Sequence, residues 1–366
     1  MCNIMKYLKK GFIHMKINYY DATMIRYKEK ADEILTELPE FVKAFIDDCR
    51  GKNRSERTIL GYVTDIKTFF TVMLQENPSL NGDIKNITLD VIGSLTYKDL
   101  NEFILDIKSY SVNGEKRMNK EYAKNRKVAT IRSLFKYLYA NRDIPDNPAS
   151  ILKGPTIHDK EPVVLDVEES NDILSSIKNQ TGHSSSRQAK RCEKTKYRDL
   201  AIVTLLLGTG IRVSELVGIN LKDFNWKKNG VRVTRKGGNE QTVYFNEDVK
   251  KAIYDYIQYE RKSPDDDPDA LFVSSQNRQR LSVRSVERMI KKYAQTNVPD
   301  KKITPHRLRA SYGTNLLAAT GDINLVADAL GHSNLASVKK YIHKAEENRL
   351  KARESVTWTK NNTENK

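Results

Sequence analysis

Residues 304–309 read Thr-Pro-His-Arg-Leu-Arg, and the segment from Arg307 to Ala319 has the apolar spacing of a helix. His306 and Arg309 are three residues apart, which places both side chains on one face of that helix. A histidine in such a position is most often a packing or capping residue, so the pair alone decides little. Its meaning depends on which other polar groups the chain can bring beside it.

Downstream, residues 330–332 read Leu-Gly-His, and Tyr341 follows nine residues after that histidine. Upstream, residues 208–216 read Gly-Thr-Gly-Ile-Arg-Val-Ser-Glu-Leu and place Arg212 just after a glycine-rich turn. Taken singly, these groups are weak signals, because Arg212 beside Glu215 predicts an ordinary salt bridge and the chain has 18 tyrosines. Together they offer imidazole, guanidinium and phenol groups, which suit the binding and attack of a phosphodiester.

The bulk composition points to a polyanionic partner. The chain has 366 residues, which is comfortable for two domains, and 39% hydrophobic residues, which is enough to build cores. Lys and Arg total 63 against 47 Asp and Glu, giving a formal charge of +16 and a pI near 9.4. An excess of this size favours nucleic acid before a membrane surface, although genome composition also produces lysine-rich surfaces.

Several function classes lack support. No apolar run approaches the roughly eighteen residues that span a bilayer, and residues 1–16 lack the core and cleavage site of a signal peptide. Cys2, Cys49 and Cys192 are odd in number and have no metal-ligand spacing. No phosphate-binding Gly-x-x-x-x-Gly-Lys motif occurs. We therefore expect no metal, ATP or other cofactor, and a cytoplasmic, nucleoid-associated bacterial protein.

Helical patterning dominates the chain. Residues 1–35 are basic with weak periodicity and are predicted to be an N-terminal extension of uncertain order. Residues 36–150 carry helical apolar spacing, and 151–162 form a linker in which Gly-Pro and a second proline disfavour helix. Residues 163–366 form the second domain, with 179–196 as an inserted polar loop.

The one clear strand signal lies after Trp226. Residues 230–235 alternate between apolar and polar, Lys236-Gly237-Gly238-Asn239 predicts a turn, and 241–245 alternate again. A lysine at a glycine-rich hairpin tip is ordinarily a solvent-facing residue. The expected fold is therefore mainly α, with a small antiparallel sheet in the second domain.

A basic cluster marks the last helix of the first domain. Between Lys116 and Arg142 the chain has nine Lys or Arg residues and one acidic residue, Glu121. A charge run is usually a solvated face, but this bias is stronger than solubility requires. We therefore predict DNA contacts from Lys116, Arg117, Lys120, Lys124, Arg126, Lys127 and Arg132.

The polar groups of the second domain, in their order and local frames, resemble the tyrosine recombinase (phage integrase) family. The frames are Thr-Gly-Ile-Arg-Val-Ser-Glu-Leu at 209–216, His-Arg-Leu-Arg-Ala-Ser-Tyr at 306–312, Leu-Gly-His-Ser at 330–333 and Tyr-Ile-His at 341–343. The resemblance includes bacterial Xer-type recombinases and mobile-element integrases. It implies a two-domain DNA clamp, with a helical core-binding (SAM-like) domain and a catalytic domain that ends in an exchange helix. It also implies the catalytic residues Arg212, Lys236, His306, Arg309, His332 and Tyr341.

The resemblance further implies a mechanism. Tyr341 is the expected nucleophile and forms a 3′-phosphotyrosine, while Arg212 and Arg309 stabilise the phosphate oxygens. Lys236 is expected to protonate the leaving 5′-oxygen, and His306 to accept the tyrosine proton. The remaining group, the imidazole of residue 332, is the expected supporting donor to the phosphate. Neither a metal nor ATP enters this chemistry.

Assembly on DNA also follows from the resemblance. The expected partners are double-stranded DNA recombination sites, bound in pairs by a homotetramer that is a monomer or weak dimer without DNA. Residues 344–356 are long enough for a helix that docks into the neighbouring protomer. Accessory DNA-bending proteins are a further expected class of partner, and no membrane is involved.

Other readings remain open. A type IB topoisomerase uses similar chemistry without strand exchange between sites, and a DNA-binding accessory factor would need neither Tyr341 nor Lys236. Among recombinases, the basic extension at 1–35 favours integration or excision of a mobile element. The alternative role is that of a housekeeping, Xer-type resolvase of chromosome dimers.

Overall fold

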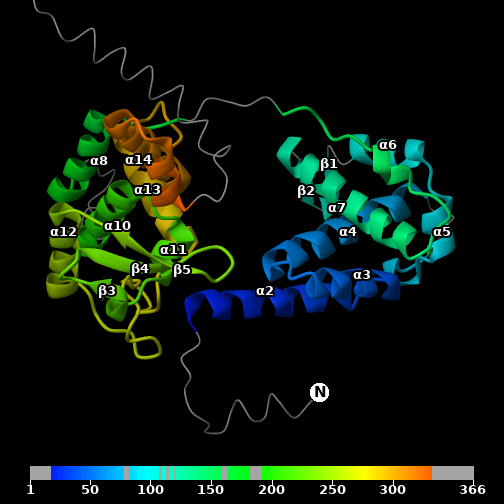
Figure 1. Ribbon diagram of the computed structural model, residues 1–366, viewed down its shortest axis with the longest axis horizontal. Helices are drawn as coiled ribbons and strands as arrows, with labels where there is room; N and C mark the ends of the chain where they lie inside the picture. The colour runs from blue at the N-terminus through cyan, green and yellow to red at the C-terminus, as the bar shows by residue number, and fades with distance from the viewer. Residues whose placement is uncertain are drawn as a thin grey trace, which may run out of the picture. The chain divides into compact units, whose positions relative to one another are not determined.

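The chain forms two compact units. The computed structural model describes residues 18–77, 82–106, 109–112, 115–118, 121–157, 163–181 and 192–331. Contacts divide the chain between Asp159 and Lys160, inside the segment in which the linker was predicted. We call residues 1–159 unit 1 and residues 160–366 unit 2, and Figure 1 labels their helices and strands.

Unit 1 is helical. Its α-helices are α2 (Tyr19–Leu35), α3 (Glu40–Gly51), α4 (Glu56–Glu76), α5 (Leu89–Ser94), α6 (Tyr97–Asp106) and α7 (Glu121–Ala140), with short 3-10 helices η2 (Ile84–Asn86) and η3 (Pro148–Ile151). Local sequence starts several of them. The Thr96 hydroxyl accepts the backbone N–H of Asp99, whose carboxylate accepts that of Thr96, which is a reciprocal capping arrangement.

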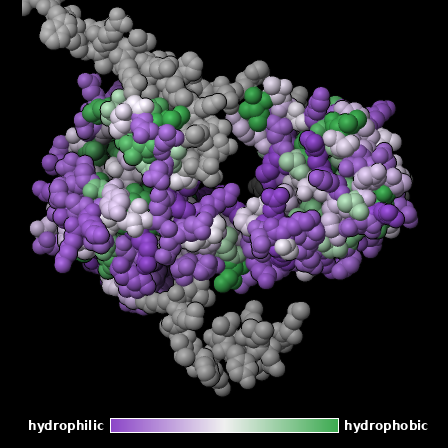
Figure 2. Space-filling view, in the orientation of Figure 1, coloured by the Kyte–Doolittle hydropathy of each residue, from purple (hydrophilic) through white to green (hydrophobic). Residues whose placement is uncertain are grey.

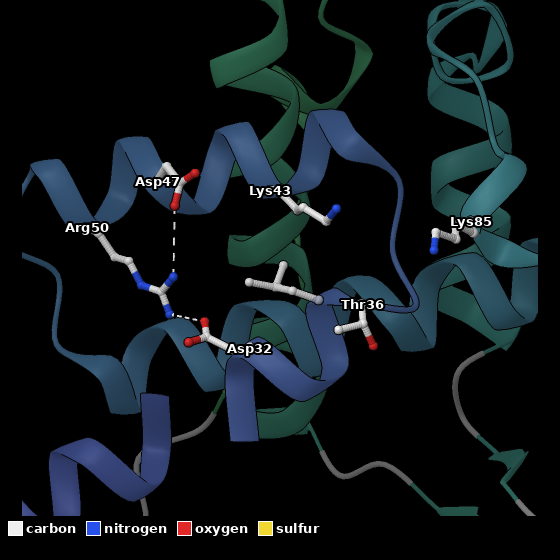
Figure 3. A pocket seen from close by; sticks show the side chains of 7 residues that line it. Asp32, Thr36, Lys43, Asp47, Arg50 and Lys85 are labelled. Carbon is white, nitrogen blue, oxygen red and sulfur yellow. Dashed lines mark hydrogen bonds and ion pairs between the residues drawn. The ribbon is translucent and has the colours of Figure 1, made fainter. Parts of the chain in front are cut away.

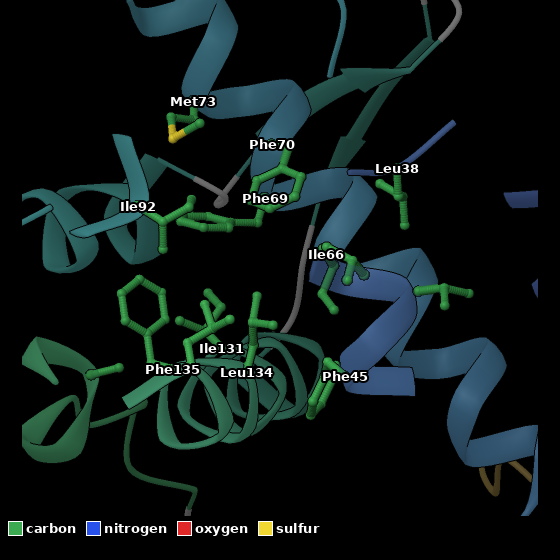
Figure 4. Close-up of a cluster of buried hydrophobic side chains, with 14 of the residues drawn as sticks. Leu38, Phe45, Ile66, Phe69, Phe70, Met73, Ile92, Ile131, Leu134 and Phe135 are labelled. Atoms are coloured by element: carbon green, nitrogen blue, oxygen red, sulfur yellow. The ribbon is translucent and has the colours of Figure 1, made fainter. Parts of the chain in front are cut away.

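The core of unit 1 lies between α3, α4, α5, α6 and α7 (Figure 4). Apolar residues spaced by three and four along α4 and α7 make it possible, because they fall on one face of each helix. Phe69 of α4 packs edge-on against Phe103 of α6, with ring centroids 4.7 Å apart. Leu134 and Phe135 of α7 are fully buried. Burying each such side chain contributes roughly 1.5–3 kcal/mol.

Helix α2 corrects the prediction of an extension up to residue 35. Its residues Ala31 and Leu35 are buried in the core of unit 1, and the helix packs along α4. An ion pair also joins α2 to α3, because Arg50 of α3 donates to Asp32 of α2 over 2.6 Å (Figure 3). The helix was missed because its apolar stripe is confined to the C-terminal end. Residues 1–17 lie outside the described residues.

A pocket of about 430 Å³ opens between α2 and α3 (Figure 3). Its lining includes no residue that the sequence predicted to be catalytic, and consists of Asp32, Leu35, Thr36, Lys43, Asp47, Arg50 and Lys85. Arg50 pairs with Asp32 of α2 and with Asp47 of its own helix, and the first of these pairs belongs to the packing of α2 and α3.

A second correction concerns strands. Unit 1 contains an antiparallel hairpin of β1 (Ser109–Val112) and β2 (Glu115–Met118), with Tyr110 opposite Arg117. The sequence predicted strands only after Trp226. The hairpin was missed because its strands have four residues each, which is too short for a clear alternation.

Unit 2 surrounds a central helix, α10 (Lys196–Thr209), whose Ile202, Leu205 and Leu206 are buried. The helix contacts most of the other helices of the unit, as its apolar character on all sides predicts. The other helices are α8 (Val167–Asn179), α11 (Val213–Gly218), α12 (Glu247–Tyr259), α13 (Val283–Asn297), α14 (Pro305–Thr320) and α15 (Ile323–Leu330). A short 3-10 helix, η4 (Leu221–Asp223), lies between α11 and β3.

The sheet of unit 2 has the strand order β3 (Phe224–Asn225), β4 (Gly230–Thr234) and β5 (Glu240–Tyr244), all antiparallel. Val231 of β4 lies opposite Val243 of β5, and Thr234 opposite Glu240. The predicted hairpin is therefore present, in a fold that is mostly helical with a small antiparallel sheet, as the sequence predicted.

Hydrophilic residues cover most of the face drawn in Figure 2. Within the described ranges, no helix is both long enough and apolar enough to cross a membrane. Much of the predicted loop 179–196 falls outside the described residues.

Candidate active site

Arg212 stands at the start of α11, directly after the turn that ends α10. Gly210 in that turn has φ +62°, a left-handed conformation that glycine adopts without strain. The Arg212 Nη1 donates to Glu215 Oε1 over 2.8 Å, and the backbone N–H of Arg212 donates to Glu215 Oε2 over 2.9 Å. The predicted salt bridge is therefore confirmed. The side chain of Arg212 is 27% exposed and that of Glu215 is 2% exposed, so the buried carboxylate holds a partly exposed guanidinium.

Arg309 connects its own helix to the turn at Gly210 and to the end of α15 at Leu330. It lies in the first turns of α14, is 5% exposed, and donates from Nη1 to the carbonyl oxygen of Gly210 over 2.6 Å. Its Nη2 donates to the carbonyl oxygen of Leu330, the last residue of α15. The guanidinium therefore joins the turn that leads to Arg212 to the helix end that leads to His332.

Close packing explains the glycine in that turn. A Cβ on Gly210 would lie 2.3 Å from a ring carbon of Tyr312 and 2.9 Å from a methyl carbon of Leu330. Burial raises the pKa of the Tyr312 phenol above its ordinary value. Any side chain at residue 210 would push α14 and α15 away from Arg212, so the Gly-Thr-Gly frame is required by packing.

Lys236 is exposed in the turn between β4 and β5. Gly237 and Gly238 follow it with φ of +90° and +85°, which forms a tight turn. The backbone N–H of Arg235 donates to the carbonyl oxygen of Asn239 over 2.7 Å and closes the loop. The lysine thus projects from a hairpin tip, as the sequence predicted.

His306 is exposed in the first turn of α14, and Arg309 lies three residues further along the helix, on the same face. Pro305 occupies the start of the helix, where its missing N–H costs nothing. Two predicted groups, His332 and Tyr341, lie outside the described residues. Gly331, which directly precedes His332, ends α15 with φ +59°.

Sequence reasoning missed one residue of this site. Arg235 is 7% exposed, and its Nη1 donates to Glu215 Oε2 over 2.8 Å. The carboxylate of Glu215 therefore lies between Arg212 and Arg235. Alternation along β4 could have predicted that Arg235 is buried, because Val231 and Val233 are buried and residue 235 continues the same face. A buried arginine needs hydrogen-bond or charged partners, and a carboxylate is a common one.

Some of the residues that were predicted to contact DNA are buried, and others are exposed. Lys127 is 3% exposed, and its Nζ lies 3.2 Å from Asp65, so we correct its prediction to a structural role. Lys124 is buried too, because both lysines extend the buried face of α7 by one turn. Arg126 and Arg132 are exposed. Lys116 and Arg117 lie in β2, and Lys120 falls outside the described residues.

Comparison with known proteins identifies the family. The model of the phage integrase family matches residues 164–348. Tyrosine recombinase XerC of Caldanaerobacter subterraneus subsp. tengcongensis is 33% identical over 355 residues, covering 94% of this chain and 92% of that protein. The chain belongs to the phage integrase family. It is a tyrosine recombinase, an enzyme of DNA breakage and rejoining.

Other relatives of this tyrosine recombinase agree. XerS of Streptococcus thermophilus is 30% identical over 340 residues, which cover 86% of this chain and 94% of that protein. The structure of XerH bound to palindromic difH substrate has a TM-score of 0.60 at 18% identity, covering 83% and 81% of the two chains. The Tn1549 transposon integrase in complex with transposon right end DNA has a TM-score of 0.59 at 20% identity, covering 85% and 99%. These structures support the same fold.

Proposed function

We propose that this tyrosine recombinase cuts and rejoins DNA at specific sites through a 3′-phosphotyrosine intermediate, with Tyr341 as the nucleophile. The main support is the contact of Arg309 with both Gly210 and Leu330, because it brings two widely separated motifs to one place. Arg212 follows the first contact by two residues, and His332 follows the second by two. Arg309 thus holds together the two chain segments from which Arg212 and His332 continue.

The arginines suit phosphate stabilisation. Each guanidinium carries fixed N–H donors and stays protonated, so it can balance the negative charge that develops on the nonbridging oxygens. Glu215 and the two backbone carbonyl oxygens hold Arg212 and Arg309 in place before DNA binds. Such preorganisation lowers the cost of the transition state, because the donors need not reorient.

Proton transfers complete the proposed reaction. The Tyr341 oxygen forms a bond to phosphorus as His306 takes the phenolic proton, and the bond from phosphorus to the 5′-oxygen breaks. Lys236 gives a proton to that oxygen, which becomes a free hydroxyl, and His332 donates to the phosphate. The aryl phosphodiester retains the bond energy, so a 5′-hydroxyl from the partner strand can reverse the step.

Unit 1 and unit 2 take the proposed roles of core-binding and catalytic domain. Arg126 and Arg132 are exposed on α7 and are the described side chains best suited to phosphate contacts, with Lys116, Arg117 and Lys120 beside them in sequence. Such contacts position a protein on DNA without reading its bases. We propose a homotetramer on paired double-stranded sites, in which residues 344–356 dock into the neighbouring protomer.

The relatives bear on the biological role. XerC and XerS match 94% and 86% of the chain at 30% identity or more. These matches weigh toward the housekeeping, Xer-type alternative, against the mobile-element role that the sequence favoured. We propose resolution of replicated chromosomes as the role to test first.

A covalent adduct tests the reaction. The protein is incubated with a suicide duplex that carries its candidate site, without metal or ATP, and compared with Tyr341→Phe. We expect a protein–DNA adduct that disappears in the variant. Tight DNA binding without any adduct would support an accessory factor, and an adduct in Tyr341→Phe would mean that another tyrosine attacks.

Two products separate the remaining enzyme classes. Exchange between two sites supports a recombinase, whereas relaxation of supercoils by the protein without exchange supports a topoisomerase. Placing the two sites on one replicated plasmid or on separate molecules then distinguishes resolution from integration.

A further inference from the structure

Arg235 is a buried cation at the base of the hairpin that carries Lys236. Its guanidinium contacts three separate elements. Nη1 donates to Glu215 of α11 over 2.8 Å, Nε donates to the side-chain oxygen of Gln241 in β5 over 3.0 Å, and Nη2 donates to the carbonyl oxygen of Ala329 in α15 over 3.3 Å. Arg235 thus connects the hairpin to α11 and to the end of α15.

The end of α15 is packed onto the same guanidinium. A Cβ on Gly331 would lie 3.0 Å from Nε of Arg235 and 3.2 Å from the side-chain oxygen of Gln241. Gln241 also donates to the carbonyl oxygen of Asp328 over 3.5 Å. The base of the hairpin is therefore held against the helix end that leads to His332.

The tip of the hairpin depends on this anchor. Lys236 is adjacent to Arg235, and the turn after it consists of two glycines with positive φ. Glycines have no side chains that could hold the tip against the rest of unit 2. The position of the exposed lysine therefore follows from how firmly the base is held.

We propose that Arg235 is a positioning residue that places Lys236 for protonation of the leaving 5′-oxygen. The inference rests on the proposed function, in which Lys236 is the proton donor. The N–H groups of Arg235 donate to Glu215, Gln241 and Ala329, so its described contacts join the base of the hairpin to α11 and α15. It acts on proton donation through the hairpin that carries Lys236, and its contact with Glu215 also links it to the carboxylate that holds Arg212.

The leaving group gives a selective test. A 5′-bridging sulfur in place of the 5′-oxygen leaves as a thiolate and needs no proton, so a defect in proton donation disappears on that substrate. Single-turnover cleavage is measured on both duplexes for wild type, Lys236→Ala and Arg235→Gln. We expect Arg235→Gln to lose about 10²-fold on the oxygen substrate and less than about tenfold on the sulfur substrate, because general acid catalysis contributes on that order.

A chemically matched arginine serves as the control. Arg280 binds a carboxylate (Asp267), a side-chain amide oxygen (Asn220) and a carbonyl oxygen (Val217), as Arg235 does, but away from the hairpin. Whatever activity Arg280→Gln loses should be lost equally on the two substrates. Arg235→Lys, which keeps the charge, should recover part of the oxygen cleavage that Arg235→Gln loses.

The possible outcomes distinguish failure of the positioning role of Arg235 from failure of the proposed function. An equal loss on both substrates in Arg235→Gln overturns the positioning role, provided that Lys236→Ala is rescued by sulfur. No rescue of Lys236→Ala removes Lys236 as proton donor, and no cleavage by wild type removes the proposed reaction. Should Arg235→Gln fail to fold, Gln241→Ala keeps the buried ion pair and should show a smaller loss on the oxygen substrate alone. Equal losses there also overturn the proposal.

Discussion

Each unit buries one carboxylate between two cationic side chains, but the cations come from different places. In unit 1, Asp65 of α4 has a fully buried side chain and lies 2.7 Å from Arg126 and 3.2 Å from Lys127. Both cations stand on the same turn of α7, and Thr130 of that helix adds a hydrogen bond of 3.1 Å. The cluster therefore fixes one helix against another.

In unit 2, Glu215 lies 2.8 Å from Arg212 and 2.8 Å from Arg235. Arg212 starts α11, whereas Arg235 follows β4 at the base of the hairpin. The carboxylate thus joins two elements, each of which carries an exposed or partly exposed cation at its end. A buried ion pair serves packing in unit 1 and, in the proposed function, the geometry of a reaction in unit 2. The surroundings of the cations make the difference.

The largest expected effect is on the stability of unit 1. Asp65→Asn leaves the charge of buried Lys127 without its carboxylate, which should cost about 3–5 kcal/mol in the free energy of unfolding. Amide hydrogen exchange along α4 and α7 measures it. The double variant with Lys127→Met should recover most of the loss, since no buried charge then remains. Unchanged protection of α7 in Asp65→Asn would show that the ion pair does not hold the helices together.

The next effect concerns catalysis in unit 2. Arg212→Ala should slow single-turnover cleavage about 10²–10³-fold, because one donor to the developing charge is lost. Arg126→Ala is the matched control, since it also removes a partly exposed arginine from a buried carboxylate. At saturating DNA, we expect Arg126→Ala to cleave nearly as fast as wild type. A comparable loss in both variants would erase the distinction between the two clusters.

A half-buried carboxylate, Glu260, adds a contrast through its pH dependence. Glu260 accepts the backbone N–H groups of Tyr197 and Arg198 at the start of α10, and burial raises its pKa to about 7. The folded state thus binds the proton more tightly than the unfolded state, so this group's contribution to stability is full below pH 4.5 and falls as pH rises to about 7.

Urea unfolding of wild type and Glu260→Gln across this range isolates that contribution. The amide keeps an acceptor for the two N–H groups but does not titrate. We expect the stability difference between the two proteins to move in favour of Glu260→Gln as pH rises from about 4.5 to 7. A difference that does not change with pH would contradict the raised pKa.

The smallest expected effect is on DNA affinity. Arg132 is exposed on α7, and Arg132→Gln should reduce the slope of log affinity against log salt concentration by about 0.9 if it neutralises one phosphate. Lys67→Gln is the control, because Lys67 is a cation on α4 outside the predicted contact set and pairs with Glu37 over 2.6 Å. An unchanged slope in Arg132→Gln would remove Arg132 from the proposed contacts.

Local signals were read correctly wherever they were strong. The strands on both sides of Lys236 follow from the alternation of apolar and polar residues, and the helices of residues 36–150 and of Arg307 to Ala319 follow from apolar spacing. Short or one-sided patterns failed. Helix α2 buries only its C-terminal end, and the strands β1 and β2 have too few residues to show an alternation.

The number of positively charged residues between 116 and 142 was a strong signal, but it was misleading. Nine cations between residues 116 and 142 suggested a uniform DNA-binding face, yet Lys124 and Lys127 lie on the buried face of α7. Charge density says nothing about which residues a helix buries. That choice depends on the partner helix, and here α4 brings a carboxylate to meet Lys127.

The sequence by itself determined the helical and strand segments and the order of motifs by which the family is known, because these depend on neighbours within a few residues. Only the tertiary structure decided which cations are paired. Glu215 and Arg235 are 20 residues apart, and Arg309 and Gly210 are 99 apart. Contacts over such separations depend on how helices and strands pack, and packing follows from the whole core and not from any single motif.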